Sequence, residues 1–259
     1  MEKTVREIQK EQNKLSGKDR DYYIRNEKKI HKEFKALVKV ARKVALNHYD
    51  PKTIDAIIIQ AYAELEKILP TLPYVGGNKS PFTTLMISSA ETIAFYKACK
   101  TYGLTPREMG KFIYEIAESY AESIPSYKKW LARKILFTGF FKNRWKKWMA
   151  ENQKREYPEN WHGEYIVGDG ISFNYGLNFN ECAWMKLARI VGAEDISPYV
   201  CLSDYAKMRA IGVGFKRTQT LVAGAPMCDF RFVKHYQTPR GWPPEKLEEN
   251  KEFYAKLKE

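Results

Sequence analysis

Three cysteines and two aspartates in the last third of the chain are the residues whose chemistry could carry an activity. Each aspartate follows a cysteine closely: Asp204 comes three residues after Cys201, and Asp229 directly after Cys228. A cysteine thiolate is a nucleophile, and a nearby carboxylate can accept or return a proton. These residue types make thiol catalysis a candidate. The spacing alone favours the plain structural interpretation, in which these two cysteines and Cys182 are small buried hydrophobic side chains.

The same three cysteines could instead hold a metal ion or cluster that activates water. Cys182, Cys201 and Cys228 stand 19 and 27 residues apart, and no C-x2-C pair occurs, so the spacing matches no zinc signature. The chain also has no histidine pair at metal-binding spacing, no glycine-rich phosphate loop and no G-x-S-x-G motif. We expect no metal cofactor and keep the three-cysteine metal site as the alternative.

Two arginines are candidates for binding a substrate carboxylate. Hydrophobic and polar residues alternate over 213–221, which predicts a strand with Arg217 on its apolar face. A guanidinium cannot shed its charge, so Arg217 needs an anion there, either an internal Asp or Glu or a ligand carboxylate or phosphate. Arg231 shares a face of the next strand with Asp229, and it either pairs with that aspartate, meets solvent or contacts substrate.

The elements that must position these residues form a small sheet with one or two helices. Alternating hydrophobicity predicts strands over 171–179, 213–221 and 228–233, the last two forming a hairpin. A helix is predicted over 180–191, with Asn180 as a possible N-cap and Cys182 in its first turn, where the helix dipole can lower the pKa of a thiol.

The N-terminal half is predicted to be helical. Apolar residues recur there at a spacing near 3.6, and Pro51 and the Thr105-Pro106-Arg107-Glu108 capping box mark helix starts. The fold class is therefore α+β, with a helical N-terminal half packed on a C-terminal antiparallel sheet. The predicted domains are a helical domain (1–155), an α+β domain with the Cys, Asp and Arg motifs (156–235), and a Pro-rich linker with a charged tail helix (236–259). The predicted helices span about 21–48, 51–70, 80–102, 106–122, 125–138, 141–153 and 244–258.

Charge is distributed unevenly along the chain. Lys and Arg exceed Asp and Glu by 44 − 31 = 13, and the whole excess lies in residues 1–155, which hold 31 basic and 17 acidic residues. A basic half, with a basic aromatic segment over 140–149, can bind nucleic acid or an anionic membrane surface. No nucleic-acid motif accompanies the charge, so we expect a solvated surface, no nucleic acid and a small-molecule substrate.

The location follows from what the sequence lacks. It contains no secretory signal and no apolar run long enough to span a bilayer, and four cysteines do not make a disulfide scaffold. We expect a cytoplasmic protein without a transmembrane segment, and the sequence leaves a homo-oligomer open.

Three stretches together resemble the L-2-amino-thiazoline-4-carboxylic acid hydrolase family. They are Asn178 to Cys182, Pro198 to Asp204, and Arg217 to Phe232, which closes on Gly-x-x-x-Cys-Asp-Phe-Arg-Phe. Gly76-Gly77-Asn78 and Ala94 to Lys97 are similar as well, so the resemblance covers about 75–233. The C-terminal half is also similar, more distantly, to the ligand-binding 4-vinyl reductase domains.

The resemblance implies a hydrolase that opens a small cyclic amidine or isothiourea by attack at the ring C2 carbon, as in the conversion of 2-amino-thiazoline-4-carboxylate to N-carbamoyl-cysteine. Cys228 or Cys201 would attack the carbon, Asp204 or Asp229 would move protons, and Arg217 would clamp the substrate carboxylate. The alternative is a non-catalytic small-molecule binding or sensor domain that uses the same pocket.

Overall fold

The computed structural model describes residue 19, residues 21–249 and residues 251–257, and the chain divides into two compact units. The first unit comprises residues 1–109, 157–160 and 183–197, and the second comprises 110–156, 161–182 and 198–259. The parts of the predicted helical domain at 1–18 and 20, and the parts of the predicted tail at 250, 258 and 259, lie outside the described residues. The domain boundaries predicted after residues 155 and 235 stay predictions.

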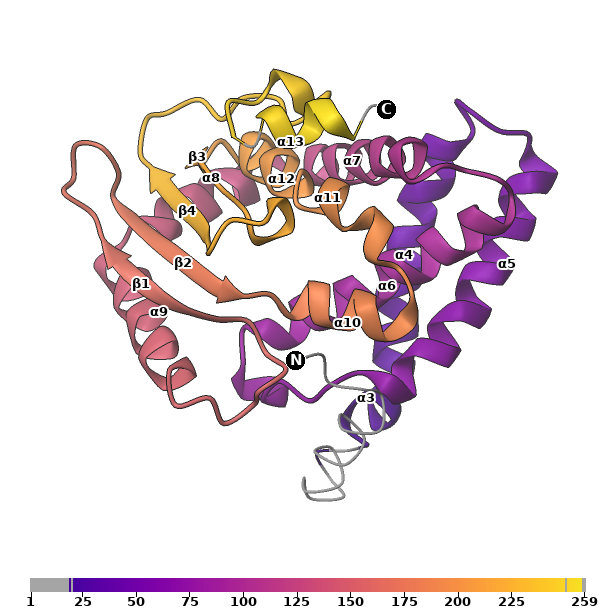
Figure 1. Ribbon diagram of the computed structural model, residues 1–259, viewed down its shortest axis with the longest axis horizontal. Helices are drawn as coiled ribbons and strands as arrows, with labels where there is room; N and C mark the ends of the chain where they lie inside the picture. Colours follow the sequence, from indigo (N-terminus) through magenta and orange to yellow (C-terminus); the bar gives the residue numbers. More distant parts are fainter. Residues whose placement is uncertain (1–18, 20, 250, 258–259) are drawn as a thin grey trace. The chain divides into compact units, whose positions relative to one another are not determined.

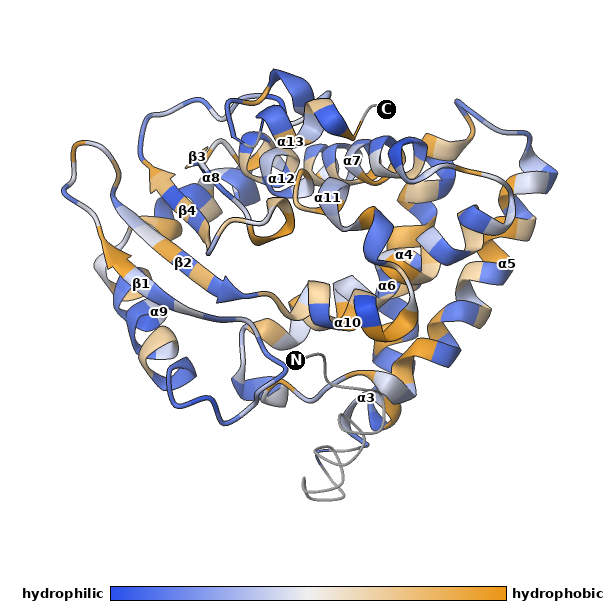
Figure 2. Cartoon of the chain, viewed as in Figure 1, coloured by the Kyte–Doolittle hydropathy of each residue, from blue (hydrophilic) through white to orange (hydrophobic). Residues whose placement is uncertain are grey.

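Helices build the first unit (Figure 1). α6 is its most buried helix, because apolar side chains occur on all sides of it, with Met86, Ala90 and Ile93 fully enclosed. α5 packs along α6 with a one-sided apolar stripe, visible as orange segments between blue ones in Figure 2. The helices of this unit are α3 (Tyr22–Arg25), α4 (Glu27–Ala45), α5 (Pro51–Ile68), α6 (Phe82–Thr101) and α10 (Ala183–Val191), with short 3-10 turns η1 (Leu69–Thr71), η2 (Gly77–Lys79) and η3 (Glu194–Ile196).

Side-chain caps stabilise two of the predicted helix starts. The Asp50 carboxylate accepts hydrogen bonds from the backbone N–H groups of Lys52 and Thr53 at the start of α5. At α7 (Pro106–Ser123), the Thr105 hydroxyl accepts from the Glu108 N–H while the Glu108 carboxylate accepts from the Thr105 N–H. The predicted capping box is confirmed.

A four-stranded antiparallel sheet organises the second unit, and with the helices it confirms the α+β class. The strand order is β1-β2-β4-β3, and β4 lies between β2 and β3, where Tyr175 stacks on Phe232 at 4.7 Å between ring centroids. The strands are β1 (His162–Val167), β2 (Tyr175–Glu181), β3 (Gly214–Lys216) and β4 (Cys228–Val233), and the helices and turns that follow α7 are α8 (Ser126–Leu136), α9 (Gly139–Asn152), α11 (Ser197–Val200), α12 (Ser203–Ile211), η4 (Leu221–Ala223), η5 (Pro244–Lys246) and α13 (Lys251–Lys256).

The first predicted strand, 171–179, was wrong at its start, because β2 begins at Tyr175. The Asp169 carboxylate accepts hydrogen bonds from the N–H groups of Ile171, Ser172 and Phe173, which bends this segment into a turn instead of a ladder. β2 also extends through Asn180, so the predicted N-cap there was wrong and α10 begins later, directly after Cys182.

The second predicted strand, 213–221, was too long. β3 ends at Lys216, because the backbone N–H groups of Thr218 and Gln219 donate to the Asp229 carboxylate and cannot pair with a neighbouring strand. β4 matches its predicted bounds, and it pairs with β3 as the predicted hairpin.

β1 was not predicted, because its sequence does not alternate between apolar and polar residues. Gly163 in this strand lies so close to β2 that an added Cβ would stand 2.1 Å from the Asn178 carbonyl oxygen. Only glycine fits there. Glycine weakens the interior of a strand, so its presence does not help to predict one.

The predicted tail helix over 244–258 is also shorter than expected, since it consists of the turn η5 and the six residues of α13. None of the helices in the described part of the chain combines the length and the apolar character needed to cross a bilayer.

Candidate active site

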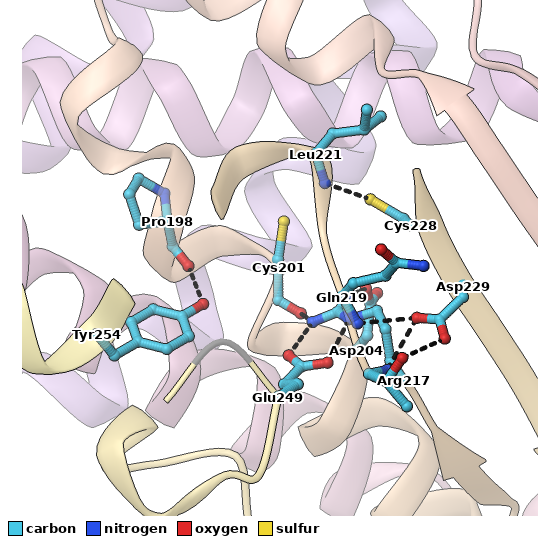
Figure 3. Close-up of polar contacts among 11 residues, drawn as sticks. Pro198, Cys201, Asp204, Arg217, Gln219, Leu221, Cys228, Asp229, Glu249 and Tyr254 are labelled. Carbon is cyan, nitrogen blue, oxygen red and sulfur yellow. Dashed lines mark hydrogen bonds and ion pairs between the residues drawn. The ribbon is translucent and has the colours of Figure 1, made fainter. Parts of the chain in front are cut away.

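The candidate site lies in the second unit and is organised by one buried cation. The side chain of Arg217, which directly follows β3, has no exposed surface. Its Nε and Nη2 donate to the two carboxylate oxygens of Glu249 at 2.8 Å each, and Nη1 donates to Asp204 Oδ2 at 3.1 Å. Figure 3 shows the guanidinium enclosed by these groups. Arg217 therefore has the internal carboxylate partners that the sequence left as one of two alternatives.

Aromatic rings surround the same guanidinium. Its central carbon lies 5.3 to 5.6 Å from the ring centroids of Tyr205, Phe215 and Phe230. Burial works to lower the pKa of Arg217, but the hydrogen bonds and the charge of Glu249 outweigh it and raise this pKa well above its ordinary value. The site thus contains a permanent positive charge held in a fixed position.

Cys201, just before α12, and Asp204, in the first turn of α12, both contact the Arg217 guanidinium. The Cys201 carbonyl oxygen accepts a hydrogen bond from Arg217 Nη2 at 3.2 Å, while its sulfur points away from the guanidinium (Figure 3). Asp204 lies in the first turn of α12, and its side chain remains 33% exposed. Of the two carboxylates on Arg217, only that of Asp204 keeps contact with solvent, because the Glu249 side chain is fully buried.

Cys228, the first residue of β4, has a backbone donor aimed at its sulfur. The N–H of Leu221 donates to Sγ at 3.2 Å (Figure 3). Burial raises the pKa of the Cys228 thiol to about 11, although the Leu221 N–H and the charge of Arg217 both act to lower it. A sulfur with a donor and a nearby cation is one that can be stabilised as a thiolate once its proton has a place to go.

The thiols share one electrostatic environment. Burial raises the pKa of Cys201 well above its ordinary value, Arg217 acts to lower it, and the neighbouring Cys182 and Cys228 raise it further. Cys182 and Asp204 likewise raise the pKa of Cys228. The three cysteines, Asp204 and Arg217 therefore lie within interaction range, and Cys201 and Cys228 are neutral thiols at neutral pH.

Their sulfurs do not form a compact ligand set. Among the described residues, three metal-ligating atoms within 4.8 Å of one another occur at Glu27, His31 and Glu66 of the first unit, and Cys182, Cys201 and Cys228 do not form such a group. The three-cysteine metal site stays a prediction.

Asp229 holds the backbone that positions Arg217. Its carboxylate accepts hydrogen bonds from the N–H groups of Thr218 and Gln219 at 2.8 and 2.9 Å and from the Thr218 hydroxyl at 2.6 Å (Figure 3). Asp229 is buried, and these contacts replace the pairing with Arg231 that the strand pattern indicated. Its contacts are those of a structural anchor for residues 217–219.

Arg231 faces away from the thiols, because successive side chains of a strand alternate and Cys228 lies three positions earlier. Its Nη1 donates to Asn178 Oδ1 and to the Phe230 carbonyl, both at 2.9 Å, and the guanidinium lies over the Phe173 ring. A role for Arg231 in substrate binding stays a prediction.

Sequence reasoning missed two residues of this cluster. Glu249 pairs with Arg217 from the segment interpreted as a linker and tail, and Tyr254 on α13 donates its hydroxyl to the Pro198 carbonyl at 2.7 Å. Glu249 sits in a charged run beside Glu248, so no signal separated it from the exposed acids around it.

The second unit thus brings together buried thiols, a fixed cation and one partly exposed carboxylate, which are the kinds of group that thiol or acid-base chemistry uses. The chain matches the model of the L-2-amino-thiazoline-4-carboxylic acid hydrolase family over residues 85–232, which is more than half of its length, and it belongs to that family. Comparison with the curated proteins and with the solved structures gives no match.

Proposed function

We propose that the chain hydrolyses a small cyclic amidine or isothiourea of the 2-amino-thiazoline-4-carboxylate type, with attack at the ring C2 carbon. Family membership supports the hydrolase class. The observation that carries the mechanism is the environment shared by Cys228, Cys201 and Asp204, all within electrostatic range of the same Arg217.

In this scheme Cys228 is the nucleophile and Asp204 carries the proton. The substrate enters with its amidine protonated, which makes C2 electrophilic. The Cys228 sulfur bonds to C2 while its proton passes to Asp204, and the result is a tetrahedral adduct. The bond between C2 and the ring sulfur then breaks, and the ring sulfur takes the proton from Asp204. An isothiouronium linked to Cys228 remains.

Water completes the reaction at the same carbon. Its oxygen adds to C2 as Asp204 takes one proton, and the C2 bond to Cys228 then breaks with return of that proton to the cysteine sulfur. The product is N-carbamoyl-cysteine, which gives the proton of the amidine to solvent. Transfer of the proton during attack is needed because the resting thiol has a pKa of about 11.

The other predicted residues take supporting roles in the proposal. Cys201 is the second thiol beside the reacting sulfur, and Arg217 holds Asp204 in position through the 3.1 Å ion pair. Asp229 fixes the segment that carries Arg217. Arg217 is a positioning residue here, because Glu249, Asp204 and the Cys201 carbonyl occupy its donors.

The test is turnover of 2-amino-thiazoline-4-carboxylate by the purified chain, measured as N-carbamoyl-cysteine by mass spectrometry. Cys228→Ser should abolish turnover and leave ligand binding intact. Asp204→Asn should lower kcat by about 10²- to 10⁴-fold. Cys99→Ser is the matched control, because Cys99 is a buried cysteine on α6 in the first unit, and it should keep full activity.

Two results would contradict the scheme. If Cys228→Ser turns over substrate at the wild-type rate, the nucleophile is not this thiol. A stoichiometric metal in elemental analysis of protein purified without oxygen, lost in the Cys182→Ser variant, would replace the thiol route by metal-activated water.

A second candidate function is binding of such a small molecule without turnover. The raised pKa values of Cys201 and Cys228 favour it, because a neutral thiol is a poor nucleophile. Calorimetric binding of 2-amino-thiazoline-4-carboxylate without any product, and with little effect of Cys228→Ser, would identify a binding domain.

A further inference from the structure

An unusually basic stretch runs through α8 and α9. Residues 126–149 contain eight Lys or Arg side chains and no Asp or Glu. The same stretch contains Trp, Tyr, Phe, Leu and Ile side chains, so positive charge and apolar surface occur together. The eight basic residues are Lys128, Lys129, Arg133, Lys134, Lys142, Arg144, Lys146 and Lys147.

α8 presents its apolar side chains to solvent. It has no buried residue, and four of its large apolar side chains are between 43% and 67% exposed. At about 100° per residue, the four exposed side chains fall within an arc of about 140°, roughly opposite the half-buried Ala132 and Leu136 that face the second unit. The four exposed residues are Tyr127, Trp130, Leu131 and Ile135.

Phe140 at the start of α9 adds to this surface with 76% exposure. The rest of α9 behaves differently, because it packs on β1 and places the ring of Phe141 against Tyr175. The basic aromatic segment predicted over 140–149 thus turns its apolar side inward, and the exposed apolar surface belongs to α8 and Phe140.

We propose that α8 and Phe140 form a docking surface for an anionic lipid bilayer. An interfacial helix carries an apolar stripe that enters the boundary of the acyl chains, with Lys and Arg beside it that meet anionic headgroups. Lys128 and Arg133 flank the stripe of α8, and Lys134 lies within it, 5.8 Å from the Trp130 ring centroid. Long lysine side chains can reach the headgroups from such positions.

The apolar component is what favours lipid over nucleic acid. Phosphate groups of a nucleic acid would satisfy the basic residues, but they offer nothing to the exposed side chains of Leu131 and Ile135. A bilayer offers both anionic headgroups and hydrocarbon. None of the residues of this surface takes part in the proposed hydrolase mechanism, so the proposal goes beyond that function.

The test is sedimentation of the full chain with two kinds of vesicle, one of phosphatidylcholine alone and one of phosphatidylcholine with an equal amount of phosphatidylglycerol. We expect binding to the anionic vesicles, weakened by salt, and little binding to the neutral ones. The double variant Lys128→Ala with Lys134→Ala should weaken binding about fivefold for each lysine removed. Trp130→Ala with Phe140→Ala should weaken it about tenfold or more.

Matched variants in other parts of the chain give the controls. Lys35→Ala with Lys39→Ala removes two exposed lysines of α4, and Ile59→Ala with Ile171→Ala removes two side chains that are 71% and 90% exposed. Both control pairs should bind vesicles like the wild type. All of these positions lie on the surface, so each variant should fold, which circular dichroism and the activity toward 2-amino-thiazoline-4-carboxylate can verify.

Three outcomes would overturn the proposal. The first is equal, weak binding to both kinds of vesicle. The second is binding to anionic vesicles that Trp130→Ala with Phe140→Ala leaves unchanged. The third is tight binding to oligothymidylate without binding to vesicles, which would identify this surface as a nucleic-acid site instead.

Discussion

Two buried ionisable side chains, one in each compact unit, are stabilised in opposite ways. Glu91 on α6 of the first unit lies among apolar side chains, and its Oε1 has no hydrogen-bond partner among the described residues. Arg217 of the second unit has a bidentate carboxylate, a second carboxylate and a backbone carbonyl around it. One buried group thus has an oxygen without a partner in the described part of the chain, and the other has a partner at each of its three nitrogens.

The chemistry of the two groups explains the difference. Burial, aided by the charge of Glu33, raises the pKa of Glu91 to about 8, so this carboxyl is neutral at pH 7 and needs no counter-ion. A guanidinium has no neutral form at accessible pH, so Arg217 must be paired wherever it is buried. A carboxyl group can therefore be buried in its neutral form without a counter-ion. A buried arginine stays charged, so the fold must supply an anionic partner for it.

The largest effect should come from removing the main partner of the buried cation. Glu249→Gln keeps the size of the side chain but leaves Arg217 with the single carboxylate of Asp204. We expect a loss of about 3–5 kcal/mol in the free energy of unfolding, measured by urea denaturation, because a buried charge loses its compensation.

The neighbouring Glu248→Gln is the matched control, since Glu248 is exposed and one residue away. It should change the free energy of unfolding by less than about 0.5 kcal/mol. Equal effects of the two variants would mean that Arg217 does not depend on the Glu249 carboxylate.

The buried Glu91 carboxyl should make the free energy of unfolding depend on pH. The pKa of Glu91 rises on folding from an ordinary 4.5 to about 8, so between these values the unfolded chain binds fewer protons and stability falls as pH rises. From about pH 5.5 to about pH 7.5 the contribution of Glu91 to the free energy of unfolding should fall by roughly 2.5 kcal/mol. Glu91→Gln should remove that fall, seen as the difference between urea midpoints of wild type and variant at the two pH values. A difference independent of pH would contradict the raised pKa.

Two aspartates that bind backbone N–H groups in the same way test how much burial matters. Asp229→Ala removes a buried acceptor of three hydrogen bonds and should cost about 1–3 kcal/mol in the free energy of unfolding. Asp169→Ala removes the equivalent acceptor in the exposed turn before β2, and it should change the thermal midpoint much less.

The pH dependence of this pair adds a second measurement. Hydrogen bonds from Ile171 and Ser172 lower the pKa of Asp169 from 3.8 to about 2, so its contribution to stability is present above about pH 4 and is lost as pH falls toward 2. The Asp169→Ala variant should lack this acid-side loss. An Asp229→Ala variant as stable as Asp169→Ala would contradict the role of Asp229 as a buried anchor.

The helices could be predicted because their signals are local. The helix start at Pro51 and the capping box of Thr105 and Glu108 depend on residues a few positions apart, and the structure confirms both. The strands were predicted less well. The ends of β2 and β3 are set by the side chains of Asp169 and Asp229, which take backbone N–H groups that the alternation pattern assigned to a sheet.

The candidate site also has a part that the sequence predicts and a part that it does not. The residue types at Cys201, Asp204 and Cys228, and the need of Arg217 for an anion, follow from the sequence and its resemblance to a family that the comparison confirms. The sequence does not show which anion pairs with Arg217, because Glu249 is 32 residues away and resembles its exposed neighbours.

The sequence by itself determined the α+β class, the family and the residues available for chemistry, because composition, periodicity and motif order are properties of nearby positions along the chain. Only the tertiary structure decided that Glu249 holds Arg217, that Asp229 anchors a loop and that α8 exposes its apolar stripe. Those outcomes depend on which distant backbone and side-chain groups become buried together, and burial is decided by the whole fold.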